Sequence, residues 1–135
     1  MIVKDSTKDM IIRELRNRLS QEKNIVFAYI HGSFLDGNEF NDVDIAIFLD
    51  QKAAALNPVD FEISLSLKLE KSLNVSVDLK ILNFAPLSFR YHATMGKLIL
   101  DHDKIIREDF LCRTWSDYFD FKPVAKIYLR EAIGA

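Results

Sequence analysis

The chain has 135 residues, of which 49% are hydrophobic, and this suits one domain with one core. With 18 Lys and Arg against 20 Asp and Glu, the formal net charge is −2, so strong general binding to nucleic acid is not expected. The single cysteine, Cys112, cannot form an internal disulfide, and the sequence lacks a signal-peptide pattern or an apolar run long enough for a membrane span. We expect a cytoplasmic protein with no membrane association.

The first half of the chain alternates the sequence signals of helices and strands. A helix is expected over Asp5–Leu19, where a capping-type start precedes apolar residues at helical spacing. Ile25–Ile30 reads as a strand, and Val43–Leu49 reads as a strand that is apolar on both faces and therefore covered by helices. Pro58 is well placed near the start of a helix that continues to Leu73. This alternation predicts a mixed α/β layer fold.

The second half of the chain adds one more strand and more helix. Asn74–Leu82 is expected to be a strand, with alternate apolar residues on one face and Asp78 on the other. Pro86 can open a helix that Gly96 ends, and the short apolar run Lys97–Leu100 follows.

The C-terminal region, Lys104–Ile133, has a helical pattern that Pro123 is expected to break. It is rich in aromatic residues, namely Phe110, Trp115, Tyr118, Phe119, Phe121 and Tyr128. The simpler interpretation is that these rings pack on the sheet. The alternative is that one face stays exposed and docks a protein partner, because aromatic residues are enriched at interface cores.

The most informative motif joins the two expected central strands. Gly32 permits a tight turn and a close backbone approach to a ligand, and Ser33 offers a hydroxyl at an expected helix N-terminus, where unpaired N–H groups favour phosphate. Asp42 and Asp44 lie two residues apart, so they point to the same face of a strand. Their mutual repulsion is relieved by a raised pKa or by a hard cation such as Mg²⁺.

Asp78 can complete a set of three carboxylates if its strand lies beside the strand of Asp44. Three carboxylates around two divalent ions are a known arrangement for in-line phosphoryl or nucleotidyl transfer.

Other possible site features carry less weight. His31, next to Gly32, could touch a phosphate, although a histidine at a strand end is more often structural. The remaining histidines and Cys112 lack zinc-site spacing, and no P-loop or dinucleotide fingerprint is present.

The order of strand, Gly32-Ser33, loop, Asp42-Val-Asp44 and the later strand with Asp78 resembles the minimal nucleotidyltransferase (MNT) family of the DNA polymerase β superfamily. The resemblance covers roughly Met10 to Asp101. It implies an α/β (α+β) nucleotidyltransferase fold, a small mixed β-sheet flanked by helices. The chain would then be a single domain, with a core at about 10–101 and a helical extension at about 104–135.

The chain departs from the common family pattern at two places near the expected nucleotide. Eight residues separate Ser33 from Asp42, which is shorter than usual in the family. Asp36 precedes Gly37 where family members often carry Arg, and an acid there would repel triphosphate oxygens.

The resemblance also implies roles for the residues of the motif. Asp42, Asp44 and Asp78 would be the catalytic and Mg²⁺-binding residues, with two ions expected, and Gly32 and Ser33 would bind the triphosphate. The expected reaction transfers a nucleoside monophosphate, AMP from ATP, to a hydroxyl acceptor. Stand-alone MNT proteins commonly serve as antitoxins of HEPN-domain ribonuclease toxins, and a toxin tyrosine is the expected acceptor.

Two other functions remain open at this point. One is a small-molecule nucleotidyltransferase of the antibiotic-modifying type, for which the C-terminal region is short. The other is a catalytically silent module that masks a toxin by contact alone, which Asp36 and the short loop favour and the three acids disfavour. The acceptor, the nucleotide base and the choice between a homo-oligomer and a hetero-oligomer stay open.

Overall fold

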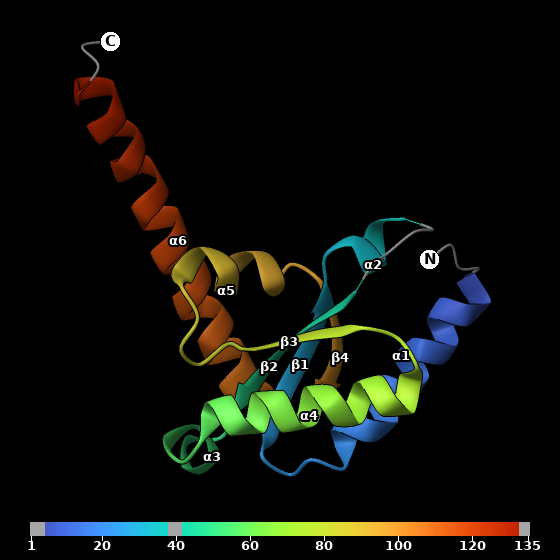
Figure 1. Cartoon of the computed structure of the whole chain (residues 1–135). Coiled ribbons are helices and arrows are strands. Elements are labelled where there is room, and N and C mark those ends of the chain that lie inside the picture. Colours follow the sequence, from blue (N-terminus) through green and yellow to red (C-terminus); the bar gives the residue numbers. More distant parts are fainter. Residues whose placement is uncertain (1–4, 38–41, 133–135) are drawn as a thin grey trace.

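The structure, a computed structural model, describes residues 5–37 and 42–132, with side chains described for 7–37 and 42–120. Helices and strands follow one another along the chain as Figure 1 shows. The helices are α1 (Asp5–Ser20), α2 (Ser33–Asp36), α3 (Gln51–Ala55), α4 (Pro58–Leu73), α5 (Leu87–Ala93) and α6 (Lys104–Ala132). The strands are β1 (Ile25–His31), β2 (Val43–Leu49), β3 (Val77–Ile81) and β4 (Lys97–Asp101).

The four strands form one mixed sheet in the order β3-β2-β1-β4. The central strand β1 pairs antiparallel with β2 and with β4, whereas β2 and β3 are parallel. The parallel pair is connected through α3 and α4, as a parallel connection requires a crossover. The small mixed sheet expected from the sequence is therefore confirmed.

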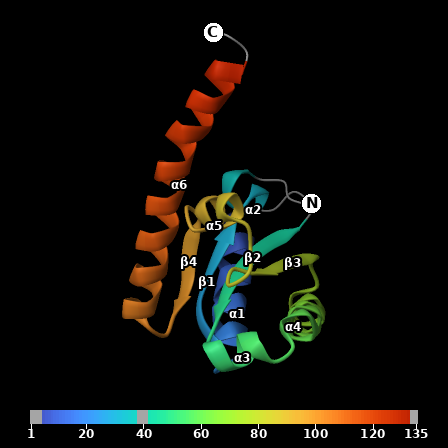
Figure 2. The same ribbon diagram turned by 90° about the vertical axis from the view of Figure 1, so that its left-hand side faces the viewer.

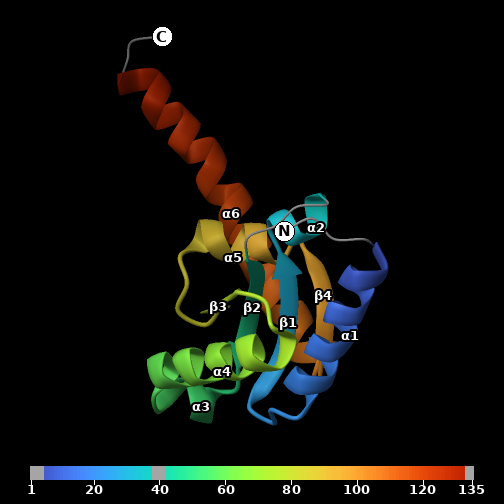
Figure 3. The ribbon, with the colours of Figure 1, turned by 45° about the vertical axis from the view of Figure 1, so that its right-hand side comes forward.

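Helices cover both faces of the sheet, and each face has its own core. Helices α1 and α4 pack on one face, where Leu15 and Leu69 meet Ile45 and Ile47 of β2. Figure 3 shows these two helices in front of the strands. Helices α5 and α6 lie on the other face over Phe27, whose ring is 5.6 Å from that of Phe110. Coverage on both sides explains why β2 is apolar in both directions.

The strand expected over Asn74–Leu82 is shorter in the structure, since β3 spans Val77–Ile81. The reason is Asn74, which adopts the left-handed conformation (φ 56°) and ends α4 with its N–H bonded to the carbonyl of Glu70. Asparagine tolerates this conformation better than most residues, so it serves as a helix terminator here. Within β3 the expected alternation holds, with Val77 buried and Asp78 exposed.

The prediction that Pro123 breaks the C-terminal helix is wrong, because α6 runs without interruption from Lys104 to Ala132. Proline inside a helix removes one backbone hydrogen bond and costs about 3 kcal/mol. That cost can kink a helix without ending it, because the hydrogen bonds of the turns on either side are kept. Figures 1 and 2 show that the first part of α6 lies along the sheet, while its C-terminal part extends away from the body of the molecule. None of the helices in the described ranges is long and apolar enough to cross a membrane.

Candidate active site

A row of polar side chains crosses three neighbouring strands at one end of the sheet. The strand register pairs His31 of β1 with Asp44 of β2, and pairs Asp44 with Asp78 of β3. Register partners on adjacent strands project from the same face, so these three side chains face the same side. Asp42 directly precedes β2 and is half-buried. The structure thus supplies the strand adjacency that the sequence could state only as a condition.

Gly32 forms the turn between β1 and α2 in a conformation that favours glycine, with φ 80°. A Cβ atom at this position would collide with the Oδ2 of Asp44. Gly32 is therefore needed for two reasons, its positive φ and the close approach of the Asp44 carboxylate. Its own position is exposed, which leaves the backbone accessible to a ligand next to that carboxylate.

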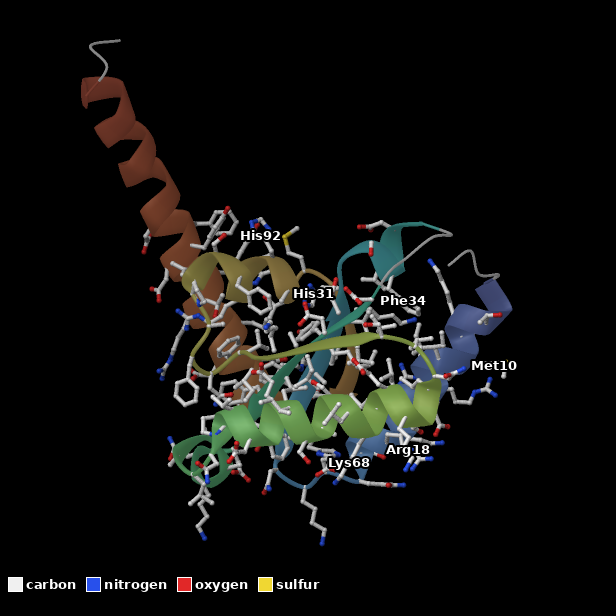
Figure 4. All side chains as sticks on the ribbon, viewed as in Figure 1. Met10, Arg18, His31, Phe34, Lys68 and His92 are labelled. Carbon is white, nitrogen blue, oxygen red and sulfur yellow. The ribbon has the colours of Figure 1, made fainter. Side chains whose placement is uncertain are left out.

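Ser33 begins the single-turn helix α2 and is exposed. The helix is held from below by Phe34, which is fully buried, and by the bond from the N–H of Leu35 to the carbonyl of Gly32. Figure 4 places Phe34 on the inner side of this turn. Because Phe34 anchors the turn, the backbone at Ser33 is held directly after Gly32.

The environment of Asp44 disfavours its charged form. Burial raises the pKa of Asp44, the His31 ring opposes this, and the charges of Asp78 and Asp42 raise it further. Repulsion among the three carboxylates is what a bound cation would relieve. The electrostatics thus agree with the arrangement expected for a metal-assisted site.

His31 belongs to this row, although the sequence favours a merely structural role for it. Burial lowers the pKa of His31, while the negative charges of Asp44 and Asp78 act in the opposite direction. Its Nε2 is buried without a hydrogen-bond partner, and its ring meets the ring of Phe89 edge-on at 5.4 Å. Figure 4 shows His31 in the region between α5 and α2. The ring is thus held between the acids and α5.

Lys80 is a residue of the site that sequence reasoning missed. Its Nζ lies 3.7 Å from Asp78 and 4.0 Å from Glu62 of α4. Lys80 therefore connects the acid row, which consists of Asp42, Asp44 and Asp78, to the neighbouring helix. Lys80 and Asp78 are about half exposed and Glu62 is partly exposed, so solvent screens these ion pairs and they contribute little to stability. The available signal was the alternation along β3, which places Lys80 on the same face as Asp78.

Lys8 is a second cation that the sequence did not point to. It reaches from α1 to the carbonyl of Gly37, at the end of α2, and its Nζ lies 5.4 Å from the centre of the Phe34 ring. Lys8 therefore brings a positive charge to α2, the helix that carries Asp36. Asp36 occupies the position at which family members often have Arg. The pairing of α1 with α2 is a tertiary contact, so no local pattern could reveal it.

The three acids fit Mg²⁺ by their chemistry, since this ion takes oxygen ligands. Within the described ranges, no three His, Cys, Asp or Glu side chains lie where they could together hold a metal ion, so the three acids are not a preassembled metal site. Mg²⁺ is usually held by one or two carboxylates together with substrate phosphates and water. Gly32 and Ser33 are exposed, and Gly32 lies against the Asp44 carboxylate.

Solved structures share this fold over nearly the whole chain. The toxin–antitoxin MntA–HepT gives a TM-score of 0.70 with 18% identity, over 93% of this chain and 98% of the matched chain. A tri-AMPylated Shewanella oneidensis HEPN toxin in complex with MNT antitoxin gives 0.71 with 19% identity, over 93% and 98%. A toxin–antitoxin with AMP-PNP gives 0.72 with 20% identity, over 90% and 98%.

A comparison with protein families identifies the chain more directly, although no curated protein matches it. Residues 13–105 match the family described as "Polymerase beta, Nucleotidyltransferase". The matched segment contains the glycine turn, the three carboxylates and all four strands described above. The chain therefore belongs to the polymerase beta nucleotidyltransferase family.

Proposed function

We propose that this chain is a Mg²⁺-dependent nucleotidyltransferase that moves AMP from ATP to a hydroxyl of a protein partner, and that it acts as the antitoxin of a HEPN ribonuclease. The observation that supports the reaction best is the pairing of Asp44 with Asp78 across adjacent strands, beside the open glycine turn.

Each residue of the site has a role in this proposal. Asp42, Asp44 and Asp78 would hold the metal, and Gly32 and Ser33 would hold the triphosphate. Bound Mg²⁺ would neutralise charge on the triphosphate and align it for in-line attack. Asp78 is the exposed member of the row, so it can also face the acceptor and accept the proton of its hydroxyl.

The proposed partner rests on the similar structures. One of them is an AMPylated HEPN toxin in complex with MNT antitoxin, and this chain covers 98% of the matched chain there. Another is a toxin–antitoxin with AMP-PNP, an ATP analogue. We extend the partner, the nucleotide and the modification to this chain, with a toxin tyrosine as the acceptor.

The end of α5 and the adjoining part of α6 offer a contact surface for that partner. Tyr91 and Tyr118 stack at 3.8 Å, and Trp115 donates a hydrogen bond to Thr94, so these rings are partly used within the chain. Phe119 remains 52% exposed beside them. Tyr128, which the sequence also suggested as a contact, lies outside the described side chains.

The experiment is to incubate the chain with Mg²⁺, each α-labelled nucleoside triphosphate and the ribonuclease that co-purifies with it. The labelled species is then identified by mass spectrometry. We expect label from ATP on a tyrosine of the ribonuclease, together with loss of RNA cleavage. Label on a small molecule would indicate an antibiotic-type enzyme, and a stable, inhibited complex without label would indicate a silent binding module.

A further inference from the structure

An apolar groove of about 450 Å³ lies beside the acid row, at the exposed edge of the sheet. It runs between the N-terminal end of α4, strand β3 and the start of α5. Its lining is mainly apolar and consists of Pro58, Val59, Glu62, Lys80, Ile81, Phe84, Ala85, Pro86 and Phe89. Two of these residues project well into solvent, Val59 at 66% and Phe84 at 65% exposure. Large exposed apolar groups that line one groove indicate a binding surface.

Two residues that line the groove contact residues of the candidate active site. Lys80, in its wall, lies 3.7 Å from the carboxylate of Asp78. Phe89, in its opposite wall, meets the ring of His31, which the strand register pairs with Asp44. A group that fills the groove therefore has its end next to Asp78, the acid proposed to face the acceptor.

The lining of the groove restricts what can occupy it. Aromatic and aliphatic side chains favour a flat apolar ring, whereas a sugar rich in hydroxyl and ammonium groups would lose hydration without gaining hydrogen bonds. The two charged residues, Lys80 and Glu62, are paired with each other at 4.0 Å on the side nearest the acids. An occupant with a ring in the groove and a polar tip toward Asp78 matches this division.

We propose that this groove is the acceptor subsite, and that it binds the ring of a tyrosine side chain of the partner protein. This inference rests on the proposed function and adds how the acceptor is selected. The phenolic oxygen forms the new bond to the α-phosphorus of ATP, the bond from that phosphorus to pyrophosphate breaks, and the phenolic proton passes to Asp78. Val59, Phe84 and Phe89 are the residues that select an aromatic acceptor.

The first test compares the variants Val59→Ser and Phe84→Ser with Leu67→Ser. Leu67 lies on the same helix as Val59 and is 61% exposed, but it does not line the groove. Because all three side chains are exposed, the variants should fold. We expect the KM for the ribonuclease acceptor to rise about tenfold or more in the two groove variants and to stay unchanged in Leu67→Ser. Binding of a fluorescent ATP analogue should be equal in all of them.

The second test uses small acceptors in place of the ribonuclease. N-acetyltyrosinamide and N-acetylserinamide are supplied separately at millimolar concentration with labelled ATP and Mg²⁺. We expect label on the tyrosine compound only, and less of it in Phe84→Ser. Equal labelling of both compounds, or groove variants with an unchanged KM while the wild type transfers AMP, would overturn the acceptor subsite alone. A wild-type protein that transfers no AMP to any acceptor would overturn the proposed function as well.

Discussion

Among the single residues of the site, Asp44 is the one that lies next to both the glycine turn and the neighbouring strands. It lies against Gly32 and is paired in register with His31 and Asp78. If Asp42 and Asp44 hold the metal, the double variant Asp42→Asn with Asp44→Asn should lose Mg²⁺-dependent ATP binding in calorimetry while keeping its fold. Asp117→Asn, an exposed acid on α6, is the control and should bind ATP normally. Unchanged ATP affinity in the double variant would refute the metal assignment.

The raised pKa of Asp44 predicts a pH dependence of stability without metal. Burial is its main cause, and the folded protein therefore binds this proton more tightly than the unfolded chain does. Stability from Asp44 is then highest at low pH and falls as pH rises from the ordinary carboxyl pKa, about 4, through the folded value. Urea unfolding in EDTA should show a smaller fall in Asp44→Asn than in wild type. Identical pH profiles would contradict this.

Gly32 and Gly37 flank the same short helix but differ in what they require. Gly32 has φ 80° and lies against Asp44, whereas Gly37 is extended, with φ −155°. Gly32→Ala should therefore weaken ATP binding and reduce the free energy of unfolding by at least about 1–2 kcal/mol, from backbone strain alone. Gly37→Ala should be close to wild type in both measurements. Equal effects of the two substitutions would show that the turn has no special role.

At the scale of elements, local patterns predicted most of the structure. The strand Val43–Leu49 was predicted with its observed bounds because it is a compact apolar run. The order β3-β2-β1-β4 could not be predicted, since strand pairing depends on contacts far apart in sequence. Short α3 was missed, and the overestimated effect of Pro123 split a helix that is continuous. The acids were found because they lie within or directly before strands, whereas Lys8 and the groove arise only from packing between elements.

Gly96 links α5 to β4, and it shows how closely these elements pack. A Cβ atom there would collide with the backbone carbonyl of Ile30 in β1, beside the active-site end of that strand. Gly96→Ala should therefore reduce the free energy of unfolding by about 1–3 kcal/mol, the range for overpacking a tight contact. Met95→Ala, at an exposed neighbouring position, should have little effect in the same denaturant titration. A Gly96→Ala protein as stable as the wild type would mean that β1 can move away from the turn at Gly96 at no cost in free energy.

At the scale of the whole molecule, the C-terminal part of α6 extends away from the sheet and leaves the α5–α6 surface open (Figures 1 and 2). If the HEPN ribonuclease docks there, Phe119→Ser should weaken the complex, by about 2 kcal/mol if Phe119 is a hot spot. Ile105→Ser, which changes an 81% exposed residue in the first turn of the same helix, is the control. Surface plasmon resonance compares the two variants. Equal affinities would place the interface elsewhere.

We propose above that the site built from His31 of β1, Asp42 and Asp44 at β2 and Asp78 of β3 transfers AMP to the partner. The most direct measurement is the intact mass of the ribonuclease after incubation with ATP and Mg²⁺, with either the wild-type chain or Asp44→Asn. We expect the wild type to add whole AMP units to the ribonuclease, which peptide fragmentation locates on tyrosine, and Asp44→Asn to add none. An unmodified ribonuclease with the wild type, or equal modification by both proteins, would contradict it.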